Sequence, residues 1–116
     1  MHTTISFDWV EHYPAAVSVC DTKGTIIAIN KPAMVLFQKY GGATLVGTSL
    51  FDCHPKAANV IIRKMLKEQN SNTYITEKQG TRHLVHQTPW YHQGQFGGLT
   101  ETIIPLPEQV AIKKRD

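Results

Sequence analysis

The chain has 116 residues, a formal net charge of +3, and 41% hydrophobic against 18% charged residues. This length suits one domain and is too short for two, and the composition is typical of a folded globular protein rather than a disordered one. No apolar run is long enough to span a membrane, and the opening MHTTISFDW lacks the features of an export signal. These observations predict a cytoplasmic protein in which Cys20 and Cys53 are reduced thiols.

The basic residues do not follow a nucleic-acid-binding pattern. Some lie in the segment after Pro55 and others in the terminal KKRD, and no aromatic residues alternate with them along one element. We therefore expect neither a nucleic acid nor a membrane as a partner. Residues 108–116 are interpreted as a solubilising basic tail.

The first part of the chain predicts a leader helix followed by a β-hairpin. Ile5 and Trp9 lie at near-helical spacing, which predicts an amphipathic leader helix over residues 1–13, ending at Pro14. The segments AVSVCD and TIIAIN are rich in β-branched residues and flank TKG, so they predict two strands joined by a turn in which Gly24 has a positive φ.

Two helices are expected next. Asn30 is placed to cap the first, which has Pro32 in its first turn and ends at the glycine pair 41–42. LVGTSLFD is expected to be a loop or a single helical turn. The segment after Pro55 is the clearest helix, because its apolar residues form one stripe. The stripe contains Ala58, Ile61, Ile62, Met65 and Leu66.

The last part of the chain predicts three strands. These are TYITEK, RHLVHQTPWY and FGGLTETII, with turns at QG and HQGQ. Two strands, then helices, then three strands predict an α+β fold class, a five-stranded antiparallel sheet with its helices on one face. We assign this domain to residues 14–107.

The ordered set of segments resembles the PAS sensor family over roughly residues 7–105. YPAAVSVCDTKGTIIAINKPA is similar to the family's opening hairpin, with its Asp, Gly and helix-starting Asn at Asp21, Gly24 and Asn30. LVGTSLFDCHP resembles the stretch ahead of the family's long helix, and GQFGGLTETI resembles its final hairpin. The resemblance implies a sensing or interaction module with a small pocket between sheet and helices. It also implies signalling through a homodimer or, since nothing of domain size follows Pro107, through a partner protein in trans.

DCHP offers the sharpest candidates for chemistry. In heme-binding PAS domains the resemblance implies a proximal histidine on the long helix, and His54 lies just ahead of that helix. The alternative is that His54 caps the helix or packs beside Phe51, so heme remains one candidate among unknown cofactors. Cys53 is either a thiol activated by the helix N-terminus or an inert one. We expect the side chains of Cys53 and His54 to diverge, which excludes them as a nucleophile and base.

The run RHLVHQTPWYH raises the question of which strand face points inward. His83 and His86 are three apart and face opposite sides, so the run predicts no metal site. We expect the face with Leu84, His86, Thr88 and Trp90 to be inward, because Trp90 has the most area to bury. If Glu101 also points inward, it needs a partner such as His86 or Thr88. The alternative places Glu101 and His86 on the exposed sheet face, where PAS domains dimerise.

These inferences give a small-molecule ligand site and two hypotheses of function. The predicted ligand-binding residues are His54, Phe51, Met65, Tyr74, His86, Thr88, Trp90 and Glu101. The first hypothesis is a sensor that binds a small ligand and signals through dimerisation or a partner. The alternative is a ligand-free interaction module whose bulky residues fill the core. We expect no enzymatic activity, since no nucleophile, base and orienting group occur together in a recognisable pattern.

Overall fold

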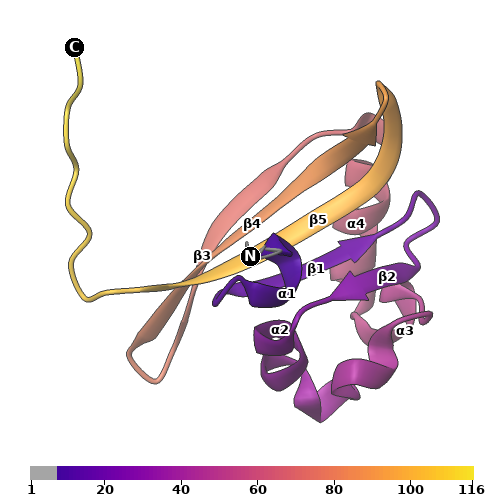
Figure 1. The fold of residues 1–116 in the computed structure, drawn as a ribbon, viewed down its shortest axis with the longest axis horizontal. Coiled ribbons are helices and arrows are strands. Elements are labelled where there is room, and N and C mark those ends of the chain that lie inside the picture. The colour runs from indigo at the N-terminus through magenta and orange to yellow at the C-terminus, as the bar shows by residue number, and fades with distance from the viewer. Residues whose placement is uncertain (1–7) are drawn as a thin grey trace, which may run out of the picture.

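The computed structural model describes residues 8–116. Its centre is a five-stranded antiparallel sheet with the strand order β2-β1-β5-β4-β3, as Figure 1 shows. The strands are β1 (Ala16–Cys20), β2 (Ile26–Ile29), β3 (Asn72–Lys78), β4 (Thr81–His92) and β5 (Gln95–Leu106). The helices are α1 (Trp9–His12), α2 (Lys31–Leu36), α3 (Leu50–Cys53) and α4 (Lys56–Glu68). The predicted α+β fold class is confirmed.

Asn30 links the first hairpin to α2. Its side chain is fully buried and accepts hydrogen bonds from the backbone N–H groups of Val17 (2.9 Å) and Ala33 (3.2 Å). Its amide donates to the carbonyl of Ala15 at 2.8 Å. The predicted cap is therefore confirmed, and the same residue also holds the start of β1. The hairpin itself turns at Gly24, whose φ is +84°, as expected.

The helix after Asn30 is shorter than predicted. It leaves α-helical geometry at Phe37 (φ −103°, ψ 20°) and continues as the 3₁₀ helices η1 (Gln38–Tyr40) and η2 (Gly42–Leu45). Ala33 in α2 is buried in the core, whereas Leu36 and Tyr40 are largely exposed. Both Leu36 and Tyr40 line a cavity of the domain.

Helix α4 follows Pro55 as predicted and ends at Gln69, which has a left-handed conformation. The buried side of the helix is narrower than the predicted stripe. Ile62 and Met65 are buried against Cys20 and Leu99, but Ile61 is 50% exposed. The helix thus covers the C-terminal end of β1 and the neighbouring part of β5, and part of its apolar stripe stays uncovered.

Strands β3, β4 and β5 form long hairpins. Their turns are two residues long, at 79–80 and 93–94, and all four residues have positive φ, the geometry of a type I′ turn. After Leu106 the chain leaves the sheet, and in Figure 1 the final residues extend away from the rest of the molecule.

The predicted leader helix is seen in part. Trp9–His12 is helical and is capped by the Asp8 side chain, whereas Ile5 lies outside the described residues. The division into residues 1–13, 14–107 and 108–116 therefore stays a prediction. Over residues 8–116, no helix is both long enough and apolar enough to cross a membrane.

Candidate functional site

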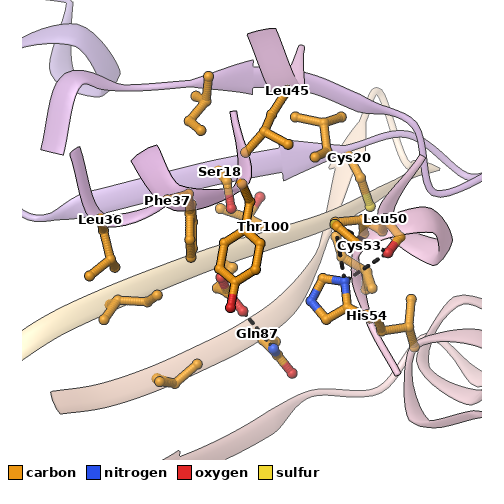
Figure 2. Close-up of a pocket in the computed structure, with 18 of the residues that line it drawn as sticks. Ser18, Cys20, Leu36, Phe37, Leu45, Leu50, Cys53, His54, Gln87 and Thr100 are labelled. Atoms are coloured by element: carbon orange, nitrogen blue, oxygen red, sulfur yellow. Dashed lines mark hydrogen bonds between the residues drawn. The ribbon is translucent and has the colours of Figure 1, made fainter. Parts of the chain in front are cut away.

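A cavity of about 580 Å³ lies between the sheet and the helices. One wall is the inner sheet face, which contributes side chains from every strand, and the opposite wall comes from α2, η1, η2, α3 and α4. Figure 2 shows the arrangement, with Leu36 and Phe37 on one side of the space and Leu50, Cys53 and His54 on the other. The apolar lining includes Ile29, Phe37, Leu45, Val85, Leu99 and Ile103.

A polar row crosses this apolar lining. Gln87 of β4, Glu101 of β5 and Ser18 of β1 lie side by side, because Gln87 pairs with Glu101 and Glu101 pairs with Ser18 in the sheet register. The Nε2 of Gln87 donates to Oε2 of Glu101 at 2.6 Å. Asn72 on β3 donates in turn to Oε1 of Gln87 at 3.2 Å. Hydrogen bonds thus connect Asn72, Gln87 and Glu101 across three strands, with Ser18 next to Glu101 in the row.

Tyr74 lies beside this row on β3 and also lines the cavity. Burial raises the pKa of its phenol, and the negative charge of Glu101 adds to this, while a hydrogen bond with Gln87 acts in the opposite direction. The phenol therefore remains a neutral hydrogen-bonding group near the row.

His54 and Cys53 meet at the end of α3, contrary to the expectation that their side chains diverge. The Sγ of Cys53 lies 3.4 Å from Nδ1 of His54, and the same Nδ1 lies 2.7 Å from the carbonyl oxygen of Leu50. Because α3 is a single turn followed by extended backbone at His54, the ring folds back over the turn. A carbonyl oxygen can only accept a hydrogen bond, so Nδ1 carries the hydrogen and donates it, and this nitrogen cannot serve Cys53 as a base.

Cys53 is not an activated thiol. Burial raises its pKa, with added contributions from the charges of Asp52 and Glu101. The residue lies at the C-terminal end of α3 rather than at a helix N-terminus, so the dipole argument for a lowered pKa does not apply. Of the two open interpretations, the structure supports the inert one.

The cavity brings together half of the predicted ligand-binding residues. His54, Met65, Tyr74 and Glu101 line it, from the end of α3, from α4, from β3 and from β5. Glu101 points inward, which was one of the two arrangements considered from the sequence. Its hydrogen-bond partner is Gln87 rather than His86 or Thr88. That any of these residues binds a ligand stays a prediction.

The prediction that Leu84, His86, Thr88 and Trp90 of β4 face the cavity was wrong. The cavity is lined by His83, Val85 and Gln87, and the alternate positions face the other side of the sheet. There His86 Nδ1 lies 2.8 Å from the hydroxyl of Thr73, and the hydroxyl of Thr88 lies 2.8 Å from that of Ser71.

Trp90 lies outside the cavity for a specific reason. Its ring packs over Gly97, where an added Cβ would come within 2.3 Å of the indole, and its Nε1 donates to the carbonyl of Cys20 at 3.0 Å. The indole thus buries its area across a glycine of β5 instead of in the cavity.

Phe51 also lies outside the cavity, on the far side of α3. Its ring packs under Gly24, and the Arg63 guanidinium lies 4.1 Å from the ring centroid. The single turn of α3 thus has one side toward the cavity, through Leu50 and Cys53, and another toward the hairpin and α4.

Sequence reasoning missed Ser18 and Gln87. Both are small or neutral polar residues in strands, and their importance follows only from the register that places them beside Glu101. Among residues 8–116, no three His, Cys, Asp or Glu side chains are grouped so as to hold a metal ion.

The architecture matches several solved structures, among them PAS domains. A C-terminal domain from Streptococcus mutans superposes with a TM-score of 0.66 at 17% identity, over 83% of this chain and 78% of that one. The PAS domain of Bordetella pertussis BvgS gives a TM-score of 0.63 at 15% identity, over 86% and 82%. The Vibrio cholerae Aer2 receptor, a dual PAS–heme oxygen sensor, gives 0.60 at 13% identity, over 80% and 95%.

The chain has the PAS fold. No family model matches the sequence, and no curated protein does either. The PAS resemblance inferred from the opening hairpin, the GTSLFD stretch and the final hairpin is therefore confirmed by the structural matches. In this PAS fold the cavity lies between the sheet and the helices, where the resemblance implied a pocket.

Proposed function

We propose that this PAS domain is a cytoplasmic signal-sensing module that binds a small ligand in the cavity and has no catalytic activity of its own. The observation that carries the proposal is the cavity itself, about 580 Å³ lined mainly by apolar side chains with a few convergent polar groups. This combination is typical of small-molecule sites. The PAS fold of sensor proteins supports a sensing role.

A ligand acts as a signal only if it favours one packing of the protein over another. The turn α3 is the element best placed to respond. Leu50 and Cys53 line the cavity, while Phe51 on the same turn contacts Gly24 and Arg63. A ligand that displaces α3 would therefore move the β1–β2 turn and α4 together, and the response would reach a dimer partner or another protein in trans.

Native mass spectrometry of the protein purified from cells tests the proposal. A bound mass that Leu36→Trp reduces would support a ligand in the cavity, because Leu36 lines it and is 45% exposed, so that a larger ring can block the space without disrupting the core. Val35→Trp is the matched control, on the same helix but 72% exposed and outside the cavity. Equal occupancy in both variants would contradict the proposal.

A second candidate function is that of a dimerisation or interaction module. On the outer sheet face the register aligns Ile75, Leu84 and Ile104 in one row across β3, β4 and β5. Ile75 is 56% exposed. An apolar row on an open sheet face is a surface that a second copy of the chain would cover.

Light scattering after size exclusion tests the second candidate. Ile75→Lys should shift a dimer toward monomer, whereas Ile61→Lys should not, since Ile61 has similar exposure on α4. A protein that is monomeric at all concentrations, or a dimer equally sensitive to both changes, would count against this face.

Heme is the alternative ligand. The contact of His54 Nδ1 with the Leu50 carbonyl fixes the ring, as backbone carbonyls do for metal-binding histidines, and leaves Nε2 as the nitrogen able to ligate. Figure 2 shows the ring projecting into the cavity. Bound heme would supply a redox-active, gas-binding iron.

Heme titration should then give a Soret band that His54→Ala shifts and His83→Ala does not. An identical spectrum in both variants would exclude His54.

A further inference from the structure

Glu101 is an uncompensated acid in the cavity. It is the sole Asp or Glu in the lining formed by the described residues, and within residues 8–116 no basic side chain forms an ion pair with it. The half-buried carboxylate accepts a hydrogen bond from Gln87 at 2.6 Å. A neutral amide orients a carboxylate but does not balance its charge.

The effect of this charge is seen on neighbouring groups. Burial raises the pKa values of the Cys20, Cys53 and Tyr74 side chains. The charge of Glu101 raises each pKa further, after Asp21 for Cys20 and Asp52 for Cys53, and as the sole charge for Tyr74. The two thiols and the phenol all line the same cavity and are held neutral. Asp21 and Asp52 lie outside the lining, so Glu101 is the acid that a bound molecule would meet.

On the helical wall, His54 projects into the cavity, and no ion pair joins it to Glu101 among residues 8–116. On the sheet wall, the basic residues of the lining lie away from Glu101. On β4, His83 is four residues from Gln87, a strand distance of about 13 Å, and Lys78 lies further still, at the β3–β4 turn. Between them and Glu101 is an apolar row formed by Val85 and Ile103. The cavity wall thus changes along the strands from acidic to apolar to basic.

We propose that the ligand carries a positively charged nitrogen, of the protonated amine or amidine class, which binds Glu101, and an apolar body that packs on Val85, Ile103 and Phe37. The inference rests on the proposed ligand-binding function and specifies it. A cation supplies the charge that the protein leaves unbalanced at Glu101. A carboxylate in the same place would be repelled and would lose its water without a partner.

Three compounds of one shape test the proposal: phenethylamine, phenethyl alcohol and 3-phenylpropanoate, titrated by calorimetry at pH 7 into protein stripped of any copurified ligand. The amine should bind at least about tenfold more tightly than the alcohol, the size expected for one favourable charged contact. The acid should bind most weakly. Glu101→Gln should remove the advantage of the amine and leave the affinity for the alcohol unchanged. The control Glu108→Gln, on the exposed terminal segment, should behave as wild type.

Several results would overturn the inference. They are equal or tighter binding of the alcohol or acid to wild type, an amine advantage that survives Glu101→Gln, and no binding of any of the compounds. A copurified ligand that is neutral or anionic at pH 7 would also overturn it. That last result would support the sensing proposal, whereas failure of sensing is shown independently by equal ligand occupancy in the Leu36→Trp and Val35→Trp proteins.

Discussion

Gln87 and Glu101 face each other across β4 and β5, with the amide Nε2 2.6 Å from the carboxylate Oε2. The Oε1 of the same amide accepts a hydrogen bond from Asn72 at 3.2 Å. Gln87 of β4 therefore connects Asn72 of β3 with Glu101 of β5. This pair organises the polar part of the cavity and gives a first prediction.

Gln87→Met should destabilise the fold by about 1–2 kcal/mol, because Met keeps the length of the side chain but cannot donate to the half-buried carboxylate. Urea unfolding at pH 7 measures the change. The exposed Gln38 offers the control, and Gln38→Met should cost less than about 0.5 kcal/mol. Equal effects at the two positions would show that the hydrogen bond to Glu101 contributes nothing.

Gly97→Ala should destabilise the protein by about 1–3 kcal/mol, since its Cβ would come within 2.3 Å of the Trp90 ring and the whole indole would have to move. The cost should fall when the ring is absent. A double-mutant cycle with Trp90→Leu therefore provides the control. Additive losses in the cycle would mean that the clash with Trp90 is not the cause.

Asn30→Ala should cost about 3 kcal/mol or more, or prevent folding, because it leaves the N–H groups of Val17 and Ala33 and the carbonyl of Ala15 without their buried partner. Asn70→Ala, at an exposed position, should be nearly neutral. Thermal unfolding of both variants decides the matter, and comparable melting temperatures would refute the role assigned to Asn30.

The pKa of Cys53 is raised, chiefly by burial, so less thiolate exists at neutral pH than for an ordinary cysteine. In a Cys20→Ser background, iodoacetamide should therefore alkylate Cys53 more slowly than it alkylates glutathione at pH 7.5. The rate should rise with pH to a midpoint above the usual range. His54→Ala should leave that midpoint nearly unchanged, because Nδ1 is committed to the Leu50 carbonyl. A midpoint below the usual range would reveal an activated thiol.

The elements of the fold could be predicted because their signals are local. Asn30 before Pro32, Gly24 in the first turn and the apolar spacing of Ile62 and Met65 each depend on neighbouring residues, and the structure contains the strands and helices they predict. The end of α2 at Leu36 was not predictable in this way. The chain continues from Leu36 into 3₁₀ turns whose backbone hydrogen bonds return to Phe37 and Gln38, a change of helix type that the residue pattern did not indicate.

The inward face of β4 depends on a nonlocal feature. A bulge opposite Trp90 shifts the β4–β5 register by one residue, so that Gln87 pairs with Glu101. Without the bulge, the two-residue turn would place His86 opposite Glu101, the partner expected from the sequence. The expectation that Trp90 lines the cavity was wrong because of Gly97, which gives the Trp90 ring a place to pack outside the cavity.

Electron density from crystals of the protein purified from cells tests most directly the claim that the cavity holds a ligand. We predict density larger than water between the sheet and the helices, in contact with Glu101 and Gln87 and bounded by Phe37. A cavity closed by its own side chains, or one that holds only water, would contradict the sensing account and favour the interaction module.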